Sequence, residues 1–267
     1  MSYAVKELFY TLQGEGSNSG RAAVFCRFTG CNLWSGRPED RPRASCQFCD
    51  TDFVGTDGPG GGRFATAAAL ASAAWAVFHD RHAATPGAPQ LIPLASPSTP
   101  AAPSSPPAAS SSPPAAPSSV PIVQATDPAA SARVRPLIVC TGGEPLLQLD
   151  AELVAALHAV GFEIAIETNG TLALPAGPGR QGGIDWVCVS PKAGTDLRLT
   201  AGDELKLVYP QPGAEPERYA HLPFGHFFLQ PMDGPARAEN TALAVRYCLL
   251  HPQWRLSLQT HKLLGIP

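Results

Sequence analysis

The sequence predicts an α/β fold built as a partial, reduced β/α barrel with about six core strands and three helices. Short apolar runs typical of buried strands alternate with polar motifs, and each motif follows the C-terminal end of a strand. In β/α barrels that rim holds the ligands. The connections at 171–183, 193–202 and 210–225 are too rich in Gly and Pro for long helices. A barrel with few helices explains both observations.

Hydrophobic patterns place the individual elements along the chain. An N-terminal strand is expected over residues 3–10, followed by a Gly-rich turn at 11–16. The six core strands are expected at 22–28, 137–140, 162–166, 184–189, 203–208 and 226–229, and a further strand starts at 255–257. The three helices are expected at 66–82, 150–160 and 238–250.

The strand at 22–28 carries an arginine on its inner face. A period of two puts Val24, Cys26 and Phe28 on one face of the strand, and Phe25 and Arg27 on the other. If the first face packs under helices, Arg27 points to the inside of the sheet. A buried, unpaired charge is costly, so Arg27 indicates an anionic ligand such as a carboxylate or phosphate. A salt bridge at the rim is the alternative.

Residues 84–136 differ in character from the rest of the chain, because they form long Pro, Ser and Ala runs with almost no charge. Such a segment cannot offset its ordering entropy by burial. The strand pattern resumes after it. We therefore expect a single domain over 1–267, interrupted by a disordered or polyproline-like insertion at about 84–136.

Composition limits the classes of partner. The net charge is −3 with 15 % charged residues, so no basic field favours nucleic acid as a direct partner. No run approaches the roughly 20 apolar residues of a membrane span, and no secretory leader begins the chain. A cytoplasmic protein acting on a small molecule is expected.

Three cysteines are spaced Cys31-x14-Cys46-x2-Cys49, which lets three thiolates converge from one loop onto a metal centre. A structural zinc site needs a fourth ligand, and none is obvious. Three thiolates on a four-iron cluster leave one iron open for a small molecule. The other four cysteines lie in apolar sequence, which indicates small buried core residues. They are Cys26, Cys140, Cys188 and Cys248.

The polar motifs, taken in order, resemble a known family. They read LQGEG, CDT after the last loop cysteine, TGGEPLLQ, ETNG, SPK, ELK, QPM and SLQTHK. A cysteine loop after the first barrel strand and a GGEP-type motif after the second resemble the radical S-adenosylmethionine (SAM) superfamily. Within it, the chain is similar to the 7-carboxy-7-deazaguanine synthases over its whole length except the proline-rich insertion.

One feature departs from the superfamily pattern. Most members space the cysteines C-x3-C-x2-C, whereas fourteen residues separate Cys31 from Cys46 here. Some members of the resembling family carry such an expanded loop. The departure therefore leaves cluster binding intact, but it leaves open which of residues 32–45 touch the cluster or a redox partner.

The resemblance implies a barrel of the radical SAM type and a defined reaction. A [4Fe-4S] cluster binds SAM at its open iron, and one electron cleaves the sulfonium to give a 5′-deoxyadenosyl radical. That radical takes hydrogen from 6-carboxy-5,6,7,8-tetrahydropterin, whose ring contracts with loss of ammonia to 7-carboxy-7-deazaguanine, in 7-deazapurine and queuosine biosynthesis. Mg²⁺, an electron donor such as flavodoxin or ferredoxin, and a homodimer are also implied.

The resemblance also implies roles for individual residues. Cys31, Cys46 and Cys49 hold the cluster, and Thr51 helps to ligate Mg²⁺, although a capping hydroxyl is its alternative role. SAM is bound by Phe48, Cys49, Asp50, Gly143, Glu144, Ser190, Pro191, Lys192, Gln230, Pro231, Met232 and Asp233. The pterin is bound by Leu12, Gln13, Gly14, Arg27, Thr141 and the carboxylate of Pro267. His261 and Lys262 either line the pocket or serve the structure.

Two alternatives remain at this point. Another radical SAM enzyme, such as a glycyl-radical activating enzyme, would share the cluster and SAM motifs but would not need LQGEG, the inward Arg27 or the terminal SLQTHKLLGIP. A zinc-stapled binding module would use the same three cysteines, with or without a histidine, and would leave GGEP and SPK without a purpose.

Overall fold

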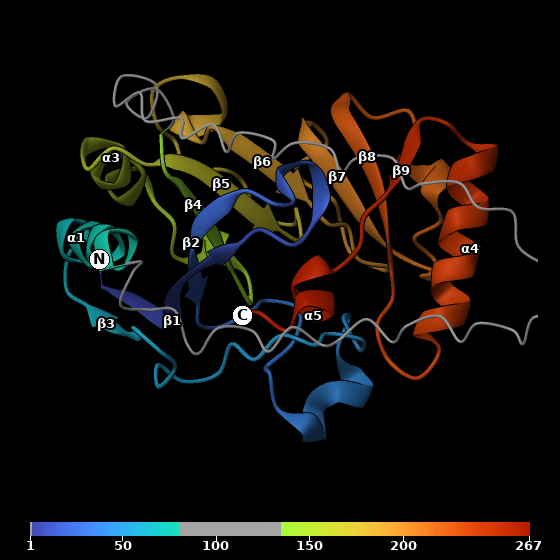
Figure 1. Ribbon diagram of the computed structural model, residues 1–267, viewed down its shortest axis with the longest axis horizontal. Helices are drawn as coiled ribbons and strands as arrows, with labels where there is room; N and C mark the ends of the chain where they lie inside the picture. Colours follow the sequence, from blue (N-terminus) through green and yellow to red (C-terminus); the bar gives the residue numbers. More distant parts are fainter. Residues whose placement is uncertain (1, 81–134) are drawn as a thin grey trace, which may run out of the picture. The chain divides into compact units, whose positions relative to one another are not determined.

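The computed structural model describes residues 2–80 and 135–267, so the expected insertion lies outside the described residues except for positions 135 and 136. Nine strands form one sheet in the order β3-β1-β2-β4-β5-β6-β7-β8-β9 (Figure 1). All neighbours from β2 to β9 run parallel, while β1 runs antiparallel to both β2 and β3. This largely parallel sheet with few helices is the predicted class of fold.

The elements follow the predicted order. The strands are β1 (Tyr3–Leu12), β2 (Ala22–Phe28), β3 (Gly62–Phe64), β4 (Leu137–Gly142), β5 (Glu163–Thr168), β6 (Trp186–Val189), β7 (Gly202–Tyr209), β8 (Phe224–Pro231) and β9 (Trp254–Leu256). The α-helices of the described ranges are α1 (Ala67–His79), α3 (Ala151–Ala159), α4 (Arg237–Leu250) and α5 (Thr260–Leu264).

Among the described residues, the sequence did not predict the strand β3 and the helix α5. β3 pairs antiparallel with β1 at one edge of the sheet, and α5 lies near the C-terminus (Figure 1). β3 has three residues and α5 has five, so neither is long enough to show a clear hydrophobic period. β9 is the further strand expected at 255–257, and it pairs in parallel with β8. The helix expected at 66–82 ends earlier, at His79.

The two faces of the parallel strands are chemically different, as the alternation on β2 predicted. On one face, buried apolar side chains such as Cys26, Ile138 and Ile164 form the main core together with residues of α1 and α3. The other face carries a smaller apolar cluster and then polar side chains near the C-terminal strand ends. These are Arg27 on β2, Thr141 on β4, Glu167 on β5, Lys206 on β7 and Gln230 on β8.

The helices α1, α3 and α4 cover the apolar face. α1 and α3 lie side by side next to β1, β2 and β5, and α4 packs against β8 and β9 (Figure 1). Thr66 begins α1 as predicted, because its hydroxyl accepts a hydrogen bond from the amide of Ala69 at 3.1 Å. In the part of the chain that the structure covers, no helix is both long and apolar enough to cross a membrane.

Asp150 joins α3 to the N-terminal strand. Its carboxylate accepts from the amide of Leu153 at 2.9 Å, which caps the helix, and from the Tyr3 hydroxyl at 2.9 and 3.0 Å. Tyr3 is buried, and burial together with the hydrogen bond to Asp150 raises the pKa of its hydroxyl. One carboxylate therefore accepts hydrogen bonds from α3 and from β1, which are distant in sequence.

We expect Asp150→Ala to lower the free energy of unfolding by about 2 kcal/mol, because a helix cap and a charged hydrogen-bond acceptor are lost together. Asp150→Asn keeps an acceptor and should recover most of the lost free energy of unfolding. Tyr3→Phe should lose only the part that comes from the hydrogen bond between Tyr3 and Asp150. Urea denaturation measures all three variants. An Asp150→Ala variant as stable as the wild type would contradict this role.

Candidate active site

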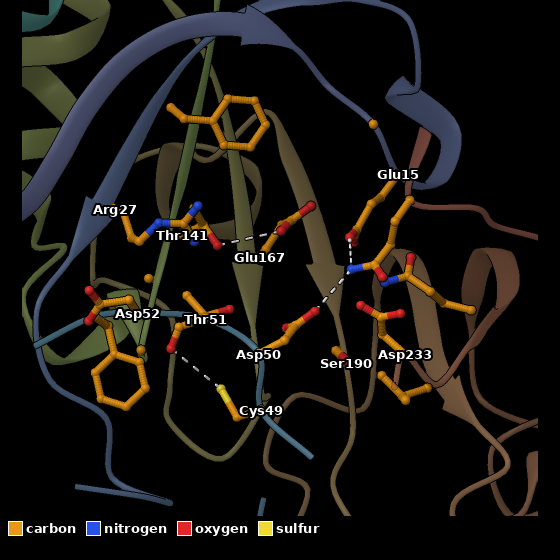
Figure 2. Close-up of a pocket in the computed structure, with 18 of the residues that line it drawn as sticks. Glu15, Arg27, Cys49, Asp50, Thr51, Asp52, Thr141, Glu167, Ser190 and Asp233 are labelled. Carbon is orange, nitrogen blue, oxygen red and sulfur yellow. Dashed lines mark hydrogen bonds between the residues drawn. The ribbon is translucent and has the colours of Figure 1, made fainter. Parts of the chain in front are cut away.

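A cavity of about 390 Å³ opens at the C-terminal ends of the parallel strands and contains most of the residues that the sequence predicted for a site (Figure 2). The predicted residues that line it are Leu12, Gln13, Gly14, Arg27, Cys31, Cys46, Phe48, Cys49, Asp50, Thr51, Thr141, Gly143, Ser190, Lys192, Gln230, Pro231, Asp233 and Pro267. Glu144, Pro191 and Met232 do not line it. Segments from both ends of the chain thus share one cavity.

The cysteine loop forms one wall of this cavity. Cys31, Cys46 and Cys49 all line it, and Cys31 accepts a hydrogen bond from the amide of Leu33 at 3.4 Å. The neighbouring thiols of Cys46 and Cys49 affect each other's ionisation: the interaction raises the pKa of Cys46 and lowers that of Cys49 to about 6. Within 2–80 and 135–267, no three Cys, His, Asp or Glu side chains meet closely enough to hold a single metal ion.

The GGEP turn lies directly against the residue before Cys31. The amide of Glu144 donates to the carbonyl oxygen of Gly30 at 2.9 Å. A side chain at Gly143 would collide with that carbonyl, so the close approach requires glycine. This contact fixes the cysteine loop to the end of β4.

Glu144 is fully buried and acts as a brace between motifs. Its carboxylate accepts from the amide of Leu146 at 3.0 Å, the hydroxyl of Thr168 at 2.7 Å and the amide of Asn169 at 2.8 Å. Burial raises its pKa, although these hydrogen bonds oppose the shift. The sequence predicted a contact between Glu144 and a ligand, whereas in the structure its oxygens hold the GGEP and ETNG motifs together.

Arg27 faces the cavity from β2, as its position in the strand predicted. It lies beside Thr141 in the parallel register of β2 and β4. Its Nε donates to Glu7 on β1 at 2.6 Å. The guanidinium is therefore anchored by a neighbouring carboxylate and still lines the cavity (Figure 2).

Lys206 lies at the centre of a buried ion cluster, which we call the Lys206 cluster. Its Nζ contacts Glu15 at 2.5 Å and Glu167 at 3.1 Å. The side-chain amide of Gln13 donates to the carboxylate of Glu167 at 3.1 Å, and the side-chain amide of Gln259 donates to the carboxylate of Glu15 at 3.1 Å. The cluster therefore joins the N-terminal turn, β5, β7 and the segment before α5.

The charges in the Lys206 cluster stabilise one another. Burial disfavours ionisation of Glu15, but the ammonium of Lys206 and several hydrogen bonds outweigh it and lower the pKa of Glu15 to about 2. Glu167 also faces Thr141, whose hydroxyl lies 3.5 Å from the second carboxylate oxygen (Figure 2). The carboxylates of the Lys206 cluster thus line the same cavity as the guanidinium of Arg27.

The C-terminal segment closes one side of the cavity. The ammonium of Lys262 on α5 contacts Asp50 and Asp233, at 2.6 Å each. The amide of Thr260 donates to the carbonyl of Gly14 at 3.0 Å. Lys262 and His261 both line the cavity, so the first of their two predicted roles is the one that the geometry favours.

Sequence reasoning assigned no role to Glu15, Glu167 and Lys206, although all three lie in motifs that it quoted. Glu167 and Lys206 also occupy inward positions of strands whose alternate residues are buried and apolar. The period-2 argument that found Arg27 would have found both residues if it had been applied to every strand.

Comparison with known proteins identifies the family. No family model matches the chain. A 7-carboxy-7-deazaguanine synthase from Caulobacter vibrioides is 52% identical over 267 residues and covers 100% of both chains. One from Bordetella pertussis is also 52% identical over 267 residues, with the same coverage. The crystal structure of QueE from Escherichia coli is 22% identical, with a TM-score of 0.54, and the match covers 97% of this chain and 94% of that one.

The structural match supports a shared fold, in agreement with the reduced β/α barrel that the sequence predicted. The full-length relatives go further, and the chain belongs to the family of 7-carboxy-7-deazaguanine synthases. The resemblance found in the sequence is thereby confirmed, and the chain is an enzyme. The relatives also decide against the two alternatives, another radical SAM enzyme and a zinc-stapled module.

We expect Lys206→Met to cost about 3–5 kcal/mol of folding free energy at pH 7, because it leaves buried carboxylates without their cation. The low pKa of Glu15 stabilises the wild type above the ordinary glutamate pKa of about 4.3, and this contribution disappears as pH falls toward about 2. In the variant the carboxylates are expected to take up protons on folding. The difference in the free energy of unfolding between the wild type and Lys206→Met, measured by urea denaturation, should therefore be smaller at pH 5 than at pH 7.

Arg180→Met is the matched control for this prediction. Arg180 pairs with Asp203 at 2.6 Å but is 67% exposed, so its removal should cost less than about 1 kcal/mol. An equally small effect of Lys206→Met would show that the buried cluster contributes little to stability.

Proposed function

We propose that this chain converts 6-carboxy-5,6,7,8-tetrahydropterin to 7-carboxy-7-deazaguanine and ammonia, a step toward 7-deazapurines and queuosine. The observation that carries the proposal is one cavity with three cysteines on one wall and Arg27 with the Lys206 cluster on the other. Full-length identity of 52% to synthases of this name supports it. The conversion is balanced, because the product and ammonia together contain all the atoms of the pterin.

Cys31, Cys46 and Cys49 are proposed to hold a [4Fe-4S] cluster. The donor set fits, because three thiols line one cavity and leave one iron without a protein ligand. When bound, the cluster supplies the electron that cleaves the sulfonium of SAM. The protein's part is to hold the thiolates, orient both ligands and exclude water.

SAM is proposed to lie between the cysteine loop and the ends of the later strands. Gly143 offers a backbone carbonyl to its amino group, while Phe48 and Asp50 lie on the adenine side. Ser190 and Lys192 approach the rest of the molecule from the end of β6, and Gln230, Pro231 and Asp233 approach it from the end of β8. We propose that Glu144, with Pro191 and Met232, shapes these loops from behind.

The pterin is proposed to lie on the inner face of the sheet. Arg27 pairs with its carboxylate, because a guanidinium held by Glu7 is already oriented toward the cavity. Leu12, Gln13, Gly14 and Thr141 offer hydrogen bonds to the ring edge, and Pro267 lines the cavity beside Thr11. Glu167, held by Lys206, offers an acceptor to ring N–H groups.

Mg²⁺ is proposed to bind beside Thr51, which lines the cavity directly after the cysteine loop. Its hydroxyl is a hard oxygen donor of the kind that this ion prefers, and the substrate carboxylate would supply another. We also propose, from the resemblance alone, a cytoplasmic homodimer reduced by a flavodoxin or ferredoxin. Light scattering and reduction by each purified donor test these points.

The proposed reaction is tested by anaerobic loading with iron and sulfide, followed by SAM, a reductant, Mg²⁺ and the carboxypterin, with products identified by mass. We expect 7-carboxy-7-deazaguanine, abolished by Cys49→Ala and unaffected by Cys248→Ala, a cysteine on α4 that does not line the cavity. Turnover should fall when chelator-treated enzyme is assayed without Mg²⁺. SAM cleavage with the pterin left untouched would overturn the substrate assignment.

Arg27→Lys separates charge from geometry at the pterin end. Lysine keeps the positive charge but cannot form the forked pair with a carboxylate, so we expect KM for the carboxypterin to rise about tenfold or more. Arg21→Lys is the control, because Arg21 pairs with Glu163 and does not line the cavity. A rise in KM of the same size in both variants would count against a contact between Arg27 and the substrate.

A further inference from the structure

The long segment between Cys31 and Cys46 folds around one buried tryptophan. Trp34 is 7% exposed and packs edge-on against Phe53, with ring centroids 5.6 Å apart. Its indole N–H donates to the carbonyl of Arg37 at 3.2 Å. Trp34 also lines the cavity, so the segment has an ordered inner side that faces the site.

Arg41 connects this tryptophan to the cysteine pair. Its guanidinium lies over the Trp34 ring, 4.1 Å from the centroid. One of its terminal nitrogens, Nη1, donates to the carbonyl of Gln47 at 2.7 Å and to that of Cys49 at 3.0 Å. That nitrogen carries two N–H groups, so each carbonyl can receive its own hydrogen.

The connection also runs in the opposite direction. The side-chain amide of Gln47 donates to the backbone carbonyl of Pro42 at 3.0 Å. The backbone amide of Ser45 donates to the carbonyl of Leu33 at 3.2 Å. The Cys46–Cys49 turn is thus held at several points by the segment between Cys31 and Cys46. Arg41 itself does not line the cavity, so it can act on the site only through the residues that it holds.

We propose that Arg41 is a positioning residue that holds the Cys46–Cys49 turn ready to receive the cluster. The proposal rests on the cluster assignment of the proposed function. An arginine suits this task because its rigid planar group can stack on an aromatic ring while it donates to two carbonyls. Lysine would keep the charge but present a single flexible ammonium. The long segment between Cys31 and Cys46 would thereby serve to hold two of the three cluster cysteines in place.

Hydrogen–deuterium exchange of the cluster-free full-length chain is the first test. In Arg41→Met, we expect exchange in a peptide covering 44–50 to be about tenfold faster, because two charge-assisted hydrogen bonds are lost. Arg41→Lys should be intermediate. Arg43→Gln is the matched control, because Arg43 is 83% exposed and contacts only Asp40 among the described residues, so its exchange should match the wild type.

Iron release from the loaded enzyme to a chelator is the second test, and it should be several-fold faster in Arg41→Met and unchanged in Arg43→Gln. Exchange at 44–50 equal to the wild type would overturn the proposal. Faster exchange spread over the sheet would mean general destabilisation and would also overturn it. If the wild type takes up no iron and sulfide, the cluster assignment itself fails, whereas fast exchange with normal iron release defeats only the positioning role.

Discussion

The site depends above all on the buried contact between Lys206 and the two carboxylates of Glu15 and Glu167. The three side chains come from the N-terminal turn, β5 and β7, so their mutual attraction holds distant parts of the chain at one face of the sheet. A buried lysine is costly unless it is paired, and here its pairing also orients the acceptors that face the cavity. Stability and ligand geometry are thereby linked.

The cysteine loop depends on a second set of contacts, made by backbone and by buried carboxylate. Gly143 lets the GGEP turn approach Gly30, the residue before Cys31, and Glu144 ties that turn to Thr168 and Asn169. The ETNG motif also contacts the cysteine loop directly, because the side-chain amide of Asn169 donates to that of Asn32 at 3.0 Å.

The sequence predicted the class of fold and most of the residues around the cavity, because alternation and motif order report on which face a side chain occupies. Arg27 is the clearest case, since its inward position follows from the apolar pattern of β2 alone. β3 and α5 were not predicted, because three or five residues carry no clear period. The pairing of Lys206 with Glu15 and Glu167 joins segments that are distant in sequence, so a local pattern cannot show it. The contacts of Arg41 are close in sequence, but they form in a loop that has no hydrophobic period to read.

Glu144 illustrates the limit of motif reasoning. The motif predicted that it contacts a ligand, but it could not show that the carboxylate is fully buried and already accepts hydrogen bonds from Leu146, Thr168 and Asn169. A motif predicts that a residue lies near the site, whereas the direction of its side chain is set by the packing around it. The distinction matters most for residues next to glycine turns, where backbone direction changes sharply.

The most direct measurement is a crystal structure of the anaerobically loaded protein with SAM and the carboxypterin. We expect the pterin to lie on the inner face of the sheet, with its carboxylate on Arg27 and its ring beside Glu167, while Lys206 still joins Glu15 and Glu167. A pterin bound elsewhere, or a Lys206 released from both carboxylates, would contradict this expectation.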